Sequence, residues 1–179
     1  MLFGAVEMNN TFKTAAFVLL SFISGFGFGL IFKFYYETNT FQPYAWDSPP
    51  IIVNCYGNDF SELQMIRAID YWTLRGQSIA FYEHSPSDEI CKNEYIEGFI
   101  ILRKSKRYDH ESGVLARTRR YTTMMVMKGA VITYRPGTQN LVWINEHELG
   151  HALGFAHVEI LGHIMHPIYD SMGGDFYKP

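Results

Sequence analysis

The apolar and polar positions divide the chain into one long apolar run and a following series of short, alternating segments. Residues 14–32 are nineteen positions without a charged side chain, and a lysine stands at each end. A helix of this length extends about 28 Å, close to the hydrocarbon thickness of a bilayer. Aromatic residues follow at positions 34–36, where an interfacial belt would lie. The pattern predicts a transmembrane helix, in contact with membrane lipid, over residues 14–36 behind a short tail of residues 1–13.

Two other interpretations of the apolar run stay open, a cleaved signal peptide and a buried core helix. The run is long and no A-x-A-like cleavage site precedes Glu37, which favours an uncleaved signal anchor. It is also apolar on all sides, unlike a helix packed against a core. Ser21, Gly25 and Gly29 fall four residues apart, and such a stripe of small residues would let two copies form a weak homodimer. We therefore expect a single-pass membrane protein.

Polar residues and three prolines interrupt the pattern in residues 37–50, which predict a linker between the membrane and a folded domain. The domain then spans residues 51–179. About 130 residues are enough to enclose a hydrophobic core.

Apolar periodicity in the first part of this domain predicts several strands and one amphipathic helix. Residues 51–56 alternate as a half-buried strand does. The sequence Asp59-Phe60-Ser61-Glu62 is a capping box, so a helix is expected to follow it. Its buried face is expected to hold Met65, Ile66, Ile69 and Trp72, and Gly76 is expected to end it. Further strands are predicted at residues 79–82, 99–102, 113–118 and 124–134. The second of these is apolar at consecutive positions and should lie inside the sheet, whereas Lys128-Gly129 interrupts the last.

The composition limits the classes of protein to which the chain can belong. The chain has 179 residues, 47% of them hydrophobic, and a formal net charge of −3, which fits one modest domain and argues against nucleic acid as a partner. Its two cysteines, Cys55 and Cys91, lack the spacing of metal ligands. A disulfide between them is left open, and it is expected only if the domain lies outside the cytoplasm.

The stretch Glu146–His157 carries the candidate chemistry. On a helix, His147 and His151 lie one turn apart on the same face, so their ring nitrogens can converge on one ion. Gly154 would end the helix, which allows His157 to return as a third ligand. Three histidines leave a fourth position for water, as in catalytic zinc sites.

The neighbouring residues fit the same interpretation. Glu148 sits about 100° round the helix from His147, outside the ligand set but within reach of a metal-activated water, where a general base is needed. Val142, Leu149 and Leu153 are expected on the opposite, buried face. The alternative is a helix whose histidines only decorate a polar face.

The pattern H-E-x-x-H-x-x-G-x-x-H, followed by a methionine eight residues after His157, resembles the metzincin zinc endopeptidases, most closely the matrixin branch. The resemblance implies an α+β zincin fold, with a twisted, mostly parallel sheet, an antiparallel edge strand and two main helices. It also implies that Met165 forms the Met-turn under the zinc, and that Pro167 and Tyr169 form a wall of the substrate pocket. The strand at residues 113–118 would be the rim that binds an extended polypeptide substrate.

The resulting prediction is a membrane-anchored zinc endopeptidase, with its catalytic domain outside the cytoplasm, that hydrolyses peptide bonds with Glu148 as general base. The alternative is a non-catalytic module that binds zinc or peptide on the same scaffold. Two smaller questions stay open. Arg117, Arg119 and Arg120 either favour acidic substrates or form a solvated charged edge. Residues 108–111 either bind a second ion or form a polar loop.

Overall fold

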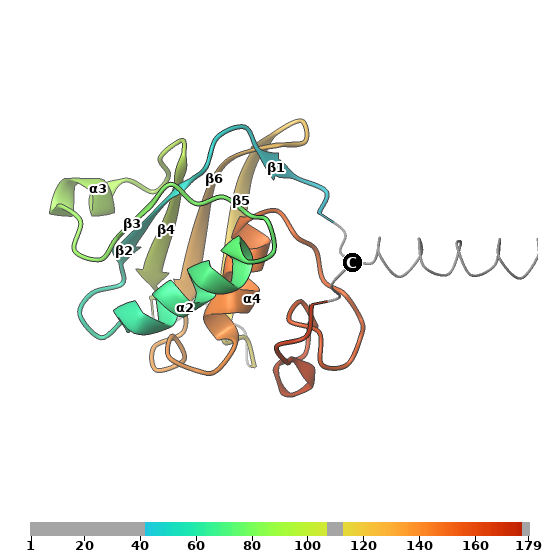
Figure 1. Ribbon diagram of the computed structural model, residues 1–179. Helices are drawn as coiled ribbons and strands as arrows, with labels where there is room; N and C mark the ends of the chain where they lie inside the picture. The colour runs from blue at the N-terminus through green and yellow to red at the C-terminus, as the bar shows by residue number, and fades with distance from the viewer. Residues whose placement is uncertain (1–41, 107–112, 177–179) are drawn as a thin grey trace, which may run out of the picture. The chain divides into compact units, whose positions relative to one another are not determined.

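The computed structural model describes residues 42–106 and 113–176, which form one mixed sheet and three helices (Figure 1). The strands are β1 (Ala45–Trp46), β2 (Ile51–Cys55), β3 (Phe81–Glu83), β4 (Phe99–Lys104), β5 (Ala116–Thr123) and β6 (Val126–Tyr134). The helices are α2 (Glu62–Thr73), α3 (Asp88–Lys92) and α4 (Ile144–Ala152), followed by the short 3₁₀ helix η1 (Tyr169–Ser171).

The sheet is parallel except at one edge. Its strands follow the order β1-β6-β4-β2-β3, and β5 pairs antiparallel with the other side of β6. The apolar strand β4 lies between β2 and β6, which confirms its predicted place inside the sheet. Lys128 and Gly129 do not end the strand, contrary to prediction, because β6 runs on through both residues, but the β5–β6 register shifts at Lys128, which has no partner on β5. A mostly parallel sheet with an antiparallel edge strand is thus confirmed.

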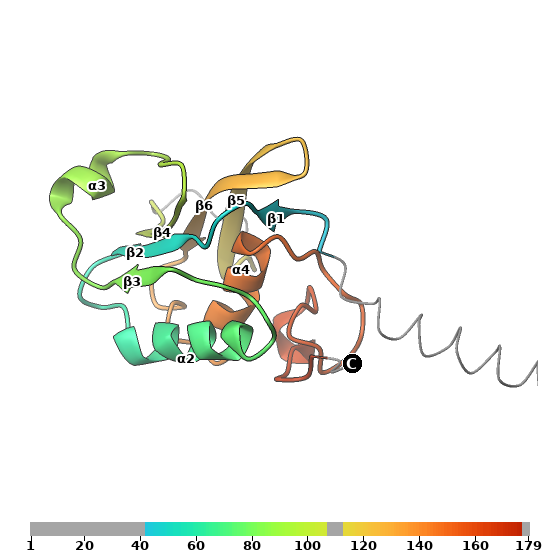
Figure 2. The same ribbon diagram turned by 45° about the horizontal axis from the view of Figure 1, so that its top comes forward.

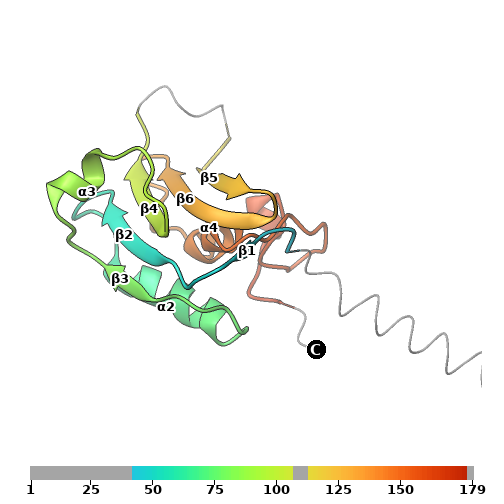
Figure 3. The same ribbon diagram turned by 90° about the horizontal axis from the view of Figure 1, so that it is seen from above.

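Helices α2 and α4 cover the same face of the sheet, as two turned views show (Figure 2 and Figure 3). The main core lies between them and the sheet, and it contains Trp72, Leu102 and Leu149. On the other face, which we call the outer face, a small cluster of buried residues consists of Val53, Ile101 and Val131, with α3 contributing Ile90 beside it.

Helix α2 begins and packs differently from the prediction. Its N-cap is Ser61, whose hydroxyl accepts a hydrogen bond from the Gln64 amide, so the predicted box starting at Asp59 does not form. The buried residues of the helix are Met65, Ala68, Tyr71 and Trp72. Ile66 is 41% exposed, because the helix turns its small Ala68 rather than Ile66 toward α4 and the sheet.

The folded domain begins before Ile51. Strand β1 pairs with β6 in parallel, and the Trp46 indole donates a hydrogen bond of 3.0 Å to the carbonyl of Ala152. The Gln42 side chain donates to the carbonyl of Leu153 at 2.9 Å. Residues 42–50, predicted as linker, are therefore part of the domain.

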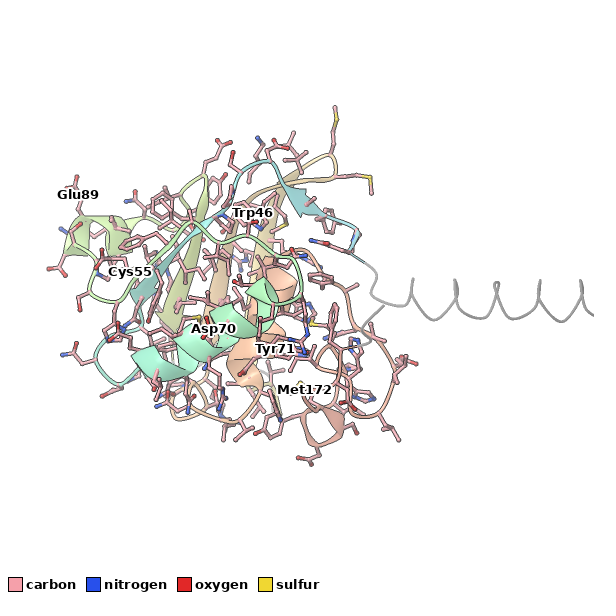
Figure 4. The ribbon with its side chains drawn as sticks, viewed as in Figure 1. Trp46, Cys55, Asp70, Tyr71, Glu89 and Met172 are labelled. Atoms are coloured by element: carbon pink, nitrogen blue, oxygen red, sulfur yellow. A yellow bond between two sulfur atoms is a disulfide. The ribbon has the colours of Figure 1, made fainter. Side chains whose placement is uncertain are left out.

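The two cysteines form a disulfide, Cys55–Cys91, which joins the end of β2 to α3 (Figure 4). Within residues 42–106 and 113–176, no helix is long and apolar enough to cross a membrane. The predicted transmembrane segment, residues 14–36, lies outside the described residues.

Candidate metal centre

Helix α4 is bounded by two residues in the left-handed conformation. Trp143 is its N-cap at φ +67°, and Gly154 follows its C-cap at φ +105°. The amides of Gly154 and Phe155 donate to the carbonyls of His151 and Gly150, which is the Schellman arrangement. A side chain at Gly154 would also meet the carbonyl oxygen of Tyr44 at 2.1 Å. The predicted helix end at Gly154 is confirmed, and it turns the chain back toward the helix.

Three imidazoles meet at this turn. One candidate ligand atom from each of His147, His151 and His157 lies within 4.8 Å of the others. The Nε2 atoms of His151 and His157 are 3.0 Å apart. His147 and His151 come from one face of α4, and His157 follows Gly154.

The surrounding backbone orients two of these rings. His147 Nδ1 lies 2.8 Å from the carbonyl oxygen of Ile164, and His151 Nδ1 lies 2.9 Å from that of Phe155. A carbonyl can only accept a hydrogen bond, so each Nδ1 carries the hydrogen and each Nε2 has a free lone pair. This arrangement is usual for metal-binding histidines.

The protonation state of the rings also suits a metal. Burial lowers the pKa of His147 to about 4 and that of His151 to about 3, and burial lowers the pKa of His157 as well. All three are therefore neutral at pH 7, the form that binds metal. Nitrogen ligands around a tetrahedral zinc ion are about 3.3 Å apart, close to the observed His151–His157 separation. The three residues fit a zinc ion with one open position.

Glu148 lies beside the imidazoles without joining the ligand set. Its carboxylate is buried, and the Thr118 hydroxyl on β5 donates to Oε2 at 2.5 Å. Burial raises the pKa of Glu148 to about 7, and the hydrogen bond from Thr118 opposes this rise. A carboxylate with a pKa near 7 is well matched to taking and returning a proton at neutral pH.

Met165 packs against α4 at Gly150, the residue before His151. A Cβ atom at Gly150 would lie 2.4 Å from the Met165 sulfur and 2.4 Å from the Trp72 ring. The missing side chain therefore lets α4 approach both residues closely. The Met165 carbonyl accepts from the Val158 amide, and the Met165 amide donates to His163 Nδ1. These contacts hold the methionine against the helix that carries His147 and His151.

A cleft of about 570 Å³ opens above the site. Glu148 and all three histidines line it, together with Pro167 and Tyr169, as the resemblance implied. Met172 also lines it, from the segment after η1 (Figure 4). The inner side of β5 forms its rim through Ala116, Thr118 and Arg120.

Two expected neighbours lie elsewhere. Val142 is 54% exposed and precedes α4, because the helix starts only at Ile144. Leu149 and Leu153 are buried as expected. Arg119 lies on the outer face, where it lines a second cavity. Arg117 borders both that cavity and the cleft, so Arg120 alone of the three arginines lines only the cleft. Residues 108–111 lie outside the described residues.

Thr118 was not expected at the site, and Arg120 was expected only as one of three arginines that either favour acidic substrates or form a solvated edge. Thr118 contacts Glu148, and the Arg120 guanidinium donates to the carbonyl of Phe155 at 3.3 Å. Both face the cleft because alternate residues of β5 point to the same side. That two-residue period, counted from Ala116, was the available signal.

Comparison with family models gives one match, to the model described as matrixin, over residues 65–177. The matched segment runs from α2 to the end of the described chain and includes every residue of the cleft. A search of curated proteins gave no match.

Proposed function

Because the chain belongs to the matrixin family of zinc metallopeptidases, we propose that it is an endopeptidase in which Glu148 acts as general base. One observation carries the proposal: the buried Glu148 carboxylate shares a cleft with three neutral imidazoles whose ligand atoms converge. Metal binding alone would require the histidines but no adjacent, buried carboxylate. The predicted zinc ligands are His147, His151 and His157.

Each residue has a separate task in this proposal. A bound zinc ion supplies Lewis acidity that activates water and stabilises negative charge on a carbonyl oxygen. Glu148 takes the proton of the attacking water and passes it to the amine that leaves. Thr118 donates to Oε2 of Glu148, which fixes the carboxylate and leaves Oε1 for the proton. Met165 packs against α4 at Gly150, where the absence of a side chain allows the close contact.

The proposed substrate is an extended polypeptide. Strand β5 pairs with β6 along one side, and among the described residues its other side has no strand partner. Free backbone groups on an edge strand can add a peptide as one more strand. A peptide held there would run along the cleft between β5 and the segment with Pro167 and Tyr169.

The decisive experiment compares Glu148→Gln with the parent. Glutamine keeps the shape but cannot take the proton, so peptide hydrolysis should fall by about 10²- to 10⁴-fold while zinc content stays unchanged. The matched control is Glu159→Gln, which changes an exposed carboxylate close to the site and should leave hydrolysis intact. The measurements are zinc content and cleavage of a mixed peptide library.

Two outcomes would contradict the proposal. Equal cleavage by the parent and Glu148→Gln would remove Glu148 from the mechanism. A parent that holds zinc but cleaves neither the library nor proteins of its own membrane would favour the non-catalytic binding module.

We further propose that residues 14–36 anchor the protein in a membrane, with the domain outside the cytoplasm. The apolar run supports the anchor, and the Cys55–Cys91 disulfide supports an oxidising compartment. The full chain should stay with membranes in alkaline carbonate, whereas a chain beginning at residue 38 should not. Release of the full chain by carbonate would contradict the anchor.

A further inference from the structure

The outer face of the sheet carries a second cavity, a groove of about 620 Å³ between α3 and the strands β4, β6 and β5. We call it the basic groove, because six cationic residues line it: Lys92, Arg103, Lys104, Lys106, Arg117 and Arg119. They come from α3, β4, the segment after β4, and β5. The residues proposed to bind zinc and to act as general base all line the other cavity, the cleft.

Strand register arranges three of these cations. Arg103 and Arg117 lie in one cross-strand row, with Thr133 of β6 between them. Neighbouring strands are about 4.8 Å apart, so the two α carbons are separated by about 10 Å. Arg119 follows Arg117 on the same face of β5, about 7 Å further along the strand. The row therefore offers positive charge at several fixed points.

The charge of the groove is opposite to that of the whole chain. The chain has 15 Lys and Arg residues and a formal net charge of −3, yet among its described lining residues the groove has a single carboxylate, Glu94. Glu94 lies 3.5 Å from Arg119, and Asp59, which does not line the groove, lies 3.6 Å from Lys104; all four side chains are largely exposed. An exposed pair at this distance neutralises little charge. A concave surface with clustered charge of one sign attracts ions of the other sign.

The floor of the groove restricts how a ligand can bind. Val131 and Thr133 lie on β6, which is hydrogen-bonded to β4 on one side and to β5 on the other. No backbone edge is free there for a peptide to join as a strand. Recognition must come from side-chain charge, and the Arg103 guanidinium is already held in place by the carbonyls of Cys91 and Asn93.

We propose that the basic groove binds a sulfated glycan. Such a polymer carries fixed anionic groups at repeated intervals and needs no backbone pairing, which suits the spaced cations of the groove. The Cys55–Cys91 disulfide beside the groove fits the proposed location outside the cytoplasm, on which this inference rests, because sulfated glycans are extracellular polymers. An acidic peptide is the competing ligand, but the backbone of β6 on the floor is already paired on both sides, so a peptide backbone could not hydrogen-bond to it. The groove would tether the enzyme to its surroundings without using the cleft.

The test uses the full chain in non-ionic detergent and a fluorescent heparin oligosaccharide as probe, with binding measured by fluorescence anisotropy across a salt series. We expect binding that weakens with salt and is abolished when desulfated heparin replaces the probe. Arg117→Gln/Arg119→Gln should weaken heparin binding at least tenfold. It should also reduce the slope of log affinity against log salt concentration by about two, one for each charge removed. Parent and variants should hold equal zinc, which shows that the domain is folded.

The matched control is Lys128→Gln/Arg135→Gln, which removes the same charge outside the groove. Lys128 is already within 3.7 Å of Asp47 and 3.3 Å of Glu97, and Arg135 is exposed beyond β6. This control should bind within twofold of the parent. Absence of heparin binding, or an equal loss in both double variants, would overturn the proposal. Tighter binding of poly-glutamate than of heparin would overturn the ligand class in favour of acidic peptides.

Discussion

The two faces of the sheet are built by different means. On the helix face, large side chains such as Trp72, Leu149 and Met165 fill a continuous core. On the outer face the described part of the chain buries only a small cluster around Ile101, and a disulfide holds the covering helix α3. The face with the dense core carries the candidate catalytic residues, and the face with little core carries the basic groove.

The difference shows what a precise polar site needs. Glu146, His147 and Glu148 are all buried among apolar side chains, where an unpaired charge would be costly. Each is held by a partner: Arg67 at 2.9 Å from Glu146, the Ile164 carbonyl at His147, and Thr118 at Glu148. Close packing on this face keeps those partners in position, whereas the cations of the groove need only lie near one another.

The sharpest way to test this comparison is to shorten two adjacent residues of β4. Leu102 and Ile101 are both fully buried but face the helix core and the outer cluster respectively. We expect Leu102→Ala to lower the free energy of unfolding by about 3–5 kcal/mol, and Ile101→Ala by about 2–3 kcal/mol, because a small cluster near the surface can collapse around the cavity. Urea unfolding measures both, and equal losses would contradict the distinction.

The disulfide gives the next largest effect. It closes a loop with a sequence separation of 36, for which chain entropy predicts about 3–4 kcal/mol of stability. Cys55→Ala/Cys91→Ala should lose about 2–4 kcal/mol in urea unfolding, yet keep its zinc affinity, because the bridge lies on the face away from the site. A parallel loss of zinc affinity would show that the two faces are coupled.

The same glycine-to-alanine substitution can be made on both faces, at Gly150 on the helix face and at Gly129 on the outer face. A Cβ at Gly150 would meet the Met165 sulfur and the buried Trp72 ring, whereas one at Gly129 would meet mainly the ring of Tyr95. Tyr95 is half-buried, so its ring can shift more than the fully buried Trp72 ring, although the shift would disturb its contact with Tyr121. Gly150→Ala should therefore cost about 1–3 kcal/mol and weaken zinc binding, and Gly129→Ala less than about 1 kcal/mol. Thermal unfolding with metal analysis checks both, and a larger loss at Gly129 would reverse the comparison.

The smallest expected effect is the pH dependence of stability, which arises from groups on the helix face. Burial lowers the pKa of His147 and His151 from 6.5 to about 4 and 3, so between pH 4.5 and 6.5 the unfolded chain binds about two more protons there. Burial raises the pKa of Glu148 from 4.5 to about 7, so the native state binds about one more proton there. For these three groups the unfolded chain binds about one more proton than the native state, and the lowered pKa values of His157 and His163 add to this difference. The stability of zinc-free protein should thus rise by about 1 kcal/mol per pH unit across this window.

Glu148→Gln removes the opposing proton and should make this rise about twice as steep. The measurement is urea unfolding of chelator-treated parent and variant at several pH values. A slope that falls with pH, or one unchanged in the variant, would contradict these protonation states.

The sequence predicted those parts of the fold that short-range periodicity controls. The consecutive apolar residues of β4 indicated an interior strand, and Gly154 marked the end of α4. The convergence of His147 and His151 followed from helix geometry alone. Each of these depends on neighbouring positions, where a period of two or 3.6 residues is enough information.

Long-range packing decided the rest. Strand β1 lies in a proline-containing stretch without alternation, and its place depends on partners more than 80 residues away. Ile66 is exposed, contrary to prediction, and Ala68 is buried instead because α4 packs close to α2. In the basic groove, Arg103 and Arg117 lie close together because both are paired with Thr133. This strand register cannot be predicted from the residues near either arginine in the sequence.

The hydrogen bonds of Gln42 and Trp46 have a mechanical consequence. They attach the first described residues to the carbonyls of Leu153 and Ala152, next to His151 in the last turn of α4. Tension applied at residue 42 would load these two bonds together with the short parallel pairing of β1 and β6 in shear. Such a force would act first on the last turn of α4, which carries His151, so a pull at residue 42 would be transmitted to one of the candidate metal ligands.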